Sequence, residues 1–95
     1  MINAEEQAME LTDIKLRKYF PDGQLEAVYS LTFDNELALH DVKLVKRDGE
    51  LIMVMPSRIM PDGSRKDIVH PINAEFRNAV AETLLKYHNT IVRGT

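Results

Sequence analysis

The amino-acid sequence predicts an α+β fold, in which a small antiparallel β-sheet of about five strands is followed by one C-terminal α-helix packed on the sheet. Apolar side chains recur with a period of two between residues 11 and 55, which is typical of half-buried strands. The period changes to 3.6 from Asn73 onward, which indicates a helix. Compact turn sequences separate the strand-like segments, as hairpin connections require.

The first two predicted strands cover residues 11–20 and 24–33. Apolar and charged side chains alternate in the first strand, and the odd-numbered positions are apolar throughout the second. Pro21-Asp22-Gly23 lies between them and combines the fixed φ of proline with the positive φ that glycine tolerates. The chain is therefore expected to reverse at this point.

The next two predicted strands are residues 36–47 and 51–55. Asp34-Asn35 provides the turn before them and Asp48-Gly49 a strong hairpin signal between them. The alternation changes phase near His40-Asp41, which predicts a β-bulge or a bend. The second strand, LIMVM, is continuously apolar, so it is expected to be central in the sheet or to lie at a subunit interface.

A loop is predicted from Pro56 to Lys66, followed by a short strand-like stretch at residues 67–70. Asn73 is a good N-cap for the helix, which is expected to end near Asn89 and to expose His88. The predicted core stripe of the helix consists of Phe76, Ala79, Val80, Thr83, Leu84 and Tyr87.

Composition limits the chain to one compact core, because 95 residues bury only about 60 to 65% of their unfolded surface. No apolar stretch approaches the ~20 residues of a membrane-spanning helix, so no membrane insertion is expected. The absence of cysteine excludes disulfides and thiolate zinc sites. The first ten residues lack the order of a secretory signal, and a cytoplasmic location is expected.

The formal net charge of -3 is unevenly distributed along the chain. Residues 1–40 contain three Lys or Arg against eight Asp or Glu, whereas residues 41–95 contain nine against seven. An anionic partner is therefore expected to meet the second half of the chain.

Three sequence blocks resemble the signature of the stage V sporulation protein G (SpoVG) family. They are Met55-Pro56-Ser57-Arg58, Pro61-Asp62-Gly63, and the run DIVHPIN from Asp67 to Asn73. Residues 11–17 and 40–44 add to the resemblance, which runs from about Glu10 to Tyr87. The residues expected to shape the signature loop are Pro56, Ser57, Pro61, Asp62, Gly63, Asp67, His70 and Pro71.

The resemblance implies a small bacterial α+β protein with an antiparallel sheet and a C-terminal helix, which is commonly a homodimer. It also implies a link to septum formation and sporulation, and a regulator of gene expression that binds DNA, RNA or both. Family members commonly begin near the position of Met9. Residues 1–9 are accordingly interpreted as a flexible acidic extension, residues 10–90 as a single domain, and residues 91–95 as a C-terminal tail.

Basic side chains cluster in and near the signature loop and are candidates for contacts with successive phosphates. Arg58, Arg65 and Lys66 belong to the loop, and Arg77 lies in the first turn of the helix, where amide groups favour anions. The preceding hairpin adds Lys43, Lys46 and Arg47. The alternative is that these cations are ordinary solvated charges answered by Asp48, Glu50, Asp62 and Asp67, and that Arg77 pairs with Glu75 or Asp67.

No residue pattern indicates an enzyme, and no cofactor is expected. His40 beside Asp41 lacks the further ligands of a metal site, and His70 before Pro71 is expected to hold the loop by a hydrogen bond. The serines lack a nucleophile elbow, and the glycines do not form a phosphate loop. The alternative function is a septation-linked protein-interaction module that works through a sheet edge or the LIMVM strand and has no physiological nucleic-acid ligand.

Overall fold

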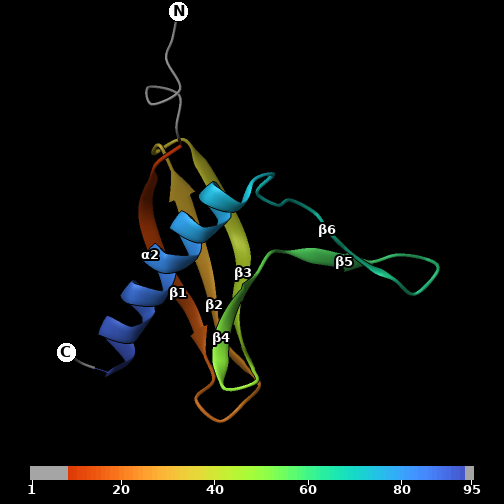
Figure 1. Cartoon of the computed structure of the whole chain (residues 1–95), viewed down its shortest axis with the longest axis horizontal. Helices are drawn as coiled ribbons and strands as arrows, with labels where there is room; N and C mark the ends of the chain where they lie inside the picture. The colour runs from red at the N-terminus through yellow and green to blue at the C-terminus, as the bar shows by residue number, and fades with distance from the viewer. Residues whose placement is uncertain (1–8, 94–95) are drawn as a thin grey trace, which may run out of the picture.

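The computed structural model describes residues 9–93 and confirms the predicted α+β class (Figure 1). Four antiparallel strands form the main sheet in the order β1-β2-β3-β4, and two further strands form a separate ribbon. The elements are β1 (Leu11–Tyr19), β2 (Leu25–Phe33), β3 (Leu37–Arg47), β4 (Glu50–Val54), β5 (Ser57–Ile59), β6 (Arg65–Asp67) and α2 (Ala74–Arg93). The predicted flexible extension, apart from Met9, and the last two residues of the predicted tail lie outside the described residues.

The turns follow from residues that tolerate positive φ. Asp48 and Gly49 have φ of 51° and 83°, and Asp34 and Asn35 both have φ of 54°. Two consecutive positive φ values are the requirement of a type I′ turn, whose twist matches that of the strands it joins. The hairpin connections predicted at Asp34-Asn35 and Asp48-Gly49 are therefore present. The chain also reverses at Pro21-Asp22-Gly23, as predicted, but Gly23 does not adopt a positive φ.

The pairing of β2 with its neighbours shifts register at four points. The register of β2 with β3 shifts between Tyr29 and Leu31, where Asp41 adopts a φ of 62°. The bulge predicted at His40-Asp41 is thus confirmed. The register of β1 with β2 shifts between Leu16 and Lys18, a bulge that the alternation of apolar residues did not predict. The other two shifts lie between Leu11 and Asp13 and between Leu25 and Ala27.

Strand β4 lies at an edge of the sheet, so the expectation of a central position for LIMVM is wrong. Only Met53 and Met55 of this segment are buried, and both face the core. Leu51, Ile52 and Val54 are partly exposed. The segment is continuously apolar although β4 has a hydrogen-bonded neighbour, β3, on one side only.

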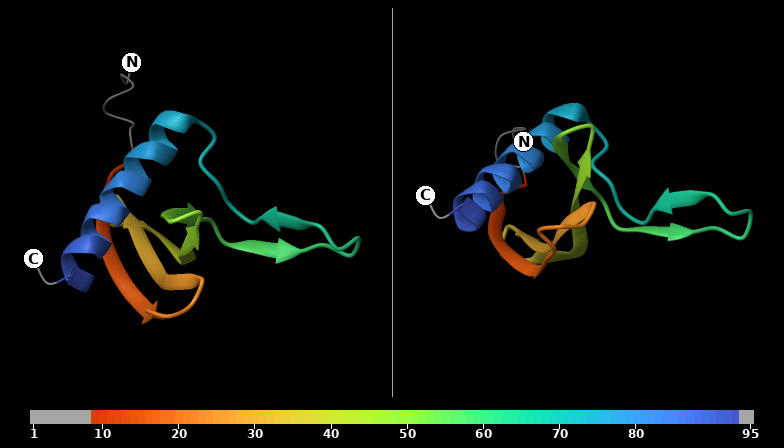
Figure 2. Two further views of the ribbon diagram at one scale, coloured as in Figure 1. Left: turned by 60° about the horizontal axis from the view of Figure 1, so that its bottom comes forward. Right: turned by 90° about the horizontal axis from the view of Figure 1, so that it is seen from below.

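Helix α2 covers one face of the sheet and leaves the other without a helix (Figure 2). The core lies between helix and sheet, and alternate residues of β2 contribute much of it. Its buried members are Ala27, Tyr29, Leu31, Phe33, Val42, Leu44, Met53, Met55, Val80 and Leu84.

The helix begins as predicted, because the Asn73 side chain accepts a hydrogen bond from the backbone N–H of Phe76 at 2.7 Å. It continues through Arg93, four residues beyond the predicted end near Asn89, so the predicted tail begins as helix. Its sheet-facing stripe repeats every four residues through Phe76, Val80, Leu84 and His88. The predicted stripe was partly wrong, since Ala79, Thr83 and Tyr87 are exposed.

His88 is 1% exposed, so the expectation that it lies on the surface is wrong. Its Nδ1 lies 2.7 Å from the Tyr29 hydroxyl, and its Nε2 binds the carboxylate of Glu26. Burial, with smaller contributions from Tyr87 and Glu26, raises the pKa of Tyr29 to about 12. The phenol therefore keeps its proton at neutral pH, and both ring nitrogens of His88 have a hydrogen-bond partner. This network joins the last turns of the helix to β2.

Candidate nucleic-acid interface

The segment expected to be an irregular loop forms a β-hairpin that projects sideways from the domain (Figures 1 and 2). We call residues 57–67 the arm. Strand β5 pairs antiparallel with β6, and Pro61-Asp62-Gly63 closes the turn with a φ of 89° at Gly63. The predicted strand at 67–70 is wrong except for Asp67, because the chain bends at Ile68 and Val69.

Side chains of the signature loop hold the turn of the arm. One carboxylate oxygen of Asp62 accepts from the Ser64 backbone N–H at 2.9 Å and from the Ser64 hydroxyl at 2.6 Å. These hydrogen bonds, the hydroxyl bond foremost, hold the pKa of Asp62 below its ordinary value. Asp62 thus acts as an anionic turn residue.

The base of the arm is fixed by backbone groups next to prolines. The carbonyl oxygen of Pro56, a buried residue, accepts from the N–H of Ile68 at 2.8 Å. His70 Nδ1 lies 3.0 Å from the carbonyl oxygen of Pro71, which is a local hydrogen bond of the kind expected for this histidine. Pro56 and Pro71 therefore mark the points where the chain leaves the domain and returns to it.

Two cations of the arm face each other across the ribbon. Arg58 of β5 is directly opposite Lys66 of β6, and both side chains are exposed. Arg65 pairs instead with Ile59, and its guanidinium donates to the Ser57 hydroxyl at 3.2 Å. Like charges directly opposite each other on a β-ribbon repel and destabilise the pair. An anion between Arg58 and Lys66 would remove that repulsion.

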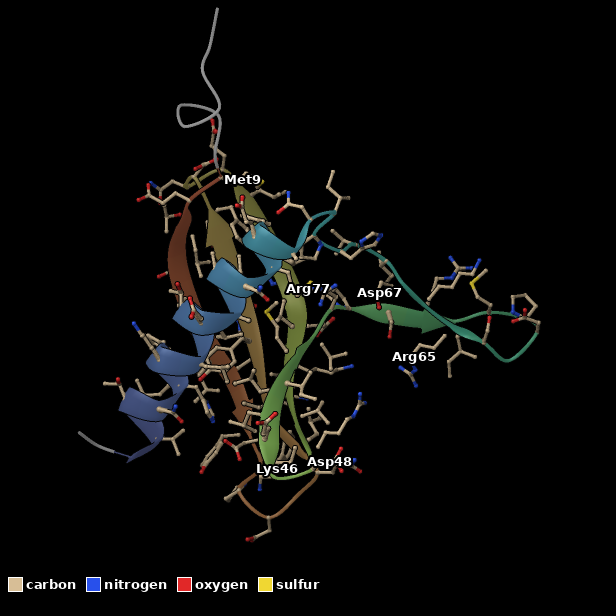
Figure 3. The ribbon with its side chains drawn as sticks, viewed as in Figure 1. Met9, Lys46, Asp48, Arg65, Asp67 and Arg77 are labelled. Carbon is tan, nitrogen blue, oxygen red and sulfur yellow. The ribbon has the colours of Figure 1, made fainter. Side chains whose placement is uncertain are left out.

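Arg77 lies next to two cations of the arm. An open groove between the base of the arm and the start of α2 is lined by Arg65, Lys66, Asp67, His70 and Arg77. Figure 3 shows Arg77 on the side of the helix toward the arm that carries Arg65 and Asp67. The groove thus collects three cations next to the amide groups of a helix N-terminus, a setting that favours an anion.

The three predicted cations of the preceding hairpin lie on two different faces of the sheet. Lys43 and Arg47 lie at alternate positions of β3, on the sheet face opposite to the helix. Lys46 lies on the other side, where its Nζ donates to the Pro21 carbonyl at 2.8 Å and lies 3.4 Å from Glu26. Figure 3 places Lys46 at the end of the sheet far from the arm. Lys46 is therefore a structural residue, and its assignment to a shared basic surface is corrected.

Ion pairs do not account for the remaining cations. Within residues 9–92, the ion pairs closer than 4.0 Å both involve Glu26, one with Lys46 and one with His88. Asp67 and Glu75, which the sequence suggested as ion-pair partners of Arg77, make no such contact with it. Three cations of β1 were not among the predicted site residues: Lys15, Arg17 and Lys18. The alternation of apolar and charged residues in β1 could have identified these cations as candidates, because it places charged side chains on the solvent-facing side of the strand.

The described part of the chain contains neither a candidate metal-binding cluster nor a candidate membrane-spanning helix. Among residues 9–93, no group of three or more His, Cys, Asp or Glu side chains could hold a metal ion. No helix within this range is long and apolar enough to cross a membrane.

Comparison with known proteins agrees with the signature in the arm. The SpoVG family model matches residues 9–90. A protein of Acetivibrio thermocellus described as "Putative septation protein SpoVG" is 44% identical over 87 residues, which cover 92% of this chain and 93% of the relative. Proteins with the same description from Thermoanaerobacter sp. (strain X514) and Clostridium kluyveri are 46% and 43% identical over 78 and 77 residues, which cover 82% and 81% of this chain and 85% and 80% of the relatives. The chain belongs to the SpoVG family of septation proteins.

Proposed function

We propose that this protein is a dimeric regulator of septation, sporulation and gene expression that binds DNA, RNA or both, and that the arm makes the phosphate contacts. One observation carries the proposal. Arg58 and Lys66 face each other on a projecting ribbon, and no acid of the described chain lies within 4.0 Å to pair with them. Phosphate oxygens would supply the missing negative charge.

The shape of the arm suits a polyanionic ligand. The arm extends from the domain and has exposed side chains, so a nucleic-acid backbone can approach it without a rearrangement of the core. Arg65 and Arg77 extend the positive charge from the ribbon to the helix N-terminus. Contacts of this kind position a protein on nucleic acid and do not by themselves read its sequence.

The test removes the facing pair alone. In the variant Arg58→Ala/Lys66→Ala, affinity for a labelled oligonucleotide at about 150 mM salt should fall about 50-fold, since two charge-assisted contacts are lost. Fluorescence anisotropy with DNA and with RNA measures the effect. Lys86→Glu on the exposed side of α2 is the matched control, because it changes the net charge by the same amount. Equal affinity of the arm variant and the control would refute the role of the arm.

Dimerisation is proposed through the free edge of β4, whose strand contains Met53. A second copy that pairs with this edge would satisfy its open backbone groups and cover Ile52 and Val54. Light scattering at micromolar concentration should give about twice the 10.9 kDa of one chain. Ile52→Lys should shift the mass toward that of a single chain, whereas Thr83→Lys on the helix should not. A single-chain mass for the unmodified protein would contradict the proposal.

A second candidate function is a septation-linked protein-interaction module. It is favoured by the apolar edge strand β4 and by apolar side chains of the arm region, where Ile59 and Ile72 are 66% and 90% exposed. Two results together would favour this candidate. Nucleic-acid binding would disappear at about 150 mM salt, and a pull-down would recover a partner protein that binds through β4 or the arm.

A further inference from the structure

The sheet face opposite to α2 carries a second group of cations. Two lysines of β1 lie on the face that points away from the core, because Lys15 pairs with Ser30 and Lys18 pairs with Val28. Lys43 pairs with Val28 from the other side and lies on the same face. This surface, which we call the open face, is therefore shared by all four strands of the main sheet and is not covered by the helix (Figure 2).

The bulge in β1 is the reason that Lys18 joins Lys15 on the open face, with Arg17 at its border. In an unbroken strand, Lys18 would share a side with Leu16 and point toward the helix. The register shift between Leu16 and Lys18 inserts Arg17 as an extra residue, so that Lys18 returns to the side of Lys15. Bulges commonly redirect a side chain next to a functional site.

Arg17 is held in place by a buried hydroxyl. Ser30 is 6% exposed, and its Oγ accepts from the Arg17 Nε–H at 2.9 Å. The same Oγ lies 2.8 Å from Nδ1 of His40, which the bulge in β3 brings to this face. Since only the Nε of the guanidinium is used, both terminal amino groups of the exposed Arg17 remain available to a ligand.

The open face has more positive than negative side chains, although the chain as a whole has a net charge of -3. Its cations are Lys15, Arg17, Lys18, Lys43 and Arg47. By the same register, the acids on this face are Asp13, opposite Thr32, and Glu50, opposite Arg47. Asp41, which lies with His40 opposite Ser30 in the bulge of β3, adds a third acid at its border. Within residues 9–92, none of these acids comes within 4.0 Å of a cation to form an ion pair.

We infer that the open face is a second binding surface for the sugar–phosphate backbone of nucleic acid, with Lys15, Arg17 and Lys18 in contact with phosphates. This inference rests on the proposed function and assigns to it a surface separate from the arm. Lysine and arginine side chains on a sheet face suit contacts with phosphate oxygens, and contacts to the backbone position a nucleic acid without reading its sequence. A nucleic-acid strand bound by the arm would also contact the domain through the open face.

The test uses the salt dependence of binding, which counts phosphate contacts. For Lys15→Ala/Lys18→Ala, the slope of log K against log salt should be smaller by about 1.8 with duplex DNA and by about 1.4 with a single strand than for the unmodified protein. Oligonucleotides of about 20 base pairs or nucleotides are long enough in the duplex form, at ~3.4 Å per pair, to exceed the 49 Å length of the molecule. Lys86→Glu, with the same change in net charge, should keep the slope of the unmodified protein.

The failure of this inference differs from the failure of the proposed function. If the arm variant loses affinity and Lys15→Ala/Lys18→Ala keeps the full slope, the open face does not bind phosphates and the arm remains the binding surface. If the unmodified protein binds neither DNA nor RNA at about 150 mM salt, both proposals fall. Lys15 and Lys18 are exposed, so the variant should retain the melting temperature of the unmodified protein.

Discussion

Replacing His88 with alanine should lower the free energy of unfolding by about 3 kcal/mol. The substitution empties a buried site and leaves the Tyr29 hydroxyl and one oxygen of Glu26 without their partner. Glu26 keeps Lys46 as a neighbour, but the helix loses its polar link to β2. Urea denaturation followed by circular dichroism measures the change.

Asn89→Ala is the control for this experiment, since it changes the next residue of the same helix at an exposed position. Its effect should stay within about 0.5 kcal/mol. If His88→Ala were as stable as this control, the buried network would contribute nothing measurable and the account of the helix docking would be wrong.

Leu84→Ala should destabilise the protein by about 3 kcal/mol, because Leu84 is 0% exposed and packs at the centre of the core between helix and sheet. The neighbouring Thr83→Ala should cost less than about 0.5 kcal/mol, since Thr83 is exposed and bonds only to the Ala79 carbonyl of its own helix. Thermal unfolding of the two variants provides the comparison. Comparable losses of stability in the two variants would mean that Thr83 contributes to the core, as the sequence predicted, and would contradict its exposed position.

The turns, the bulge in β3 and the helix start could be predicted from the sequence because each depends on local chemistry. Asp48-Gly49 tolerates the positive φ values of its turn, and Asn73 caps amides within its own first turn. The change of apolar phase at His40-Asp41 directly reports an extra residue in the pairing. No knowledge of distant residues is needed in these cases.

The arm and the buried histidine depend on information that local patterns lack. Strands β5 and β6 have three residues each, and mostly charged or exposed ones, so no apolar alternation marks them. His88 is buried because Tyr29 and Glu26 satisfy its two nitrogens from 59 and 62 positions away. A polar residue near a helix end is ordinarily exposed, and only the tertiary fold reverses that expectation.

The candidate site was predicted in part for the same reason. Proximity in sequence correctly grouped Arg65, Lys66 and Arg77, which line one groove. It also grouped Lys46 with Arg47, which the pleat of β3 places on opposite sides of the sheet. The bulge at Arg17 depends on how β1 pairs with β2, so the position of Lys18 on the open face was not evident from alternation alone.

The most direct test of the arm as the binding surface is an NMR titration of ¹⁵N-labelled protein with an oligonucleotide at about 150 mM salt. The account predicts saturable chemical-shift changes at the amides of residues 57–67 and of Arg77. Saturable binding with shifts confined to the edge strand β4, and none in the arm, would contradict it.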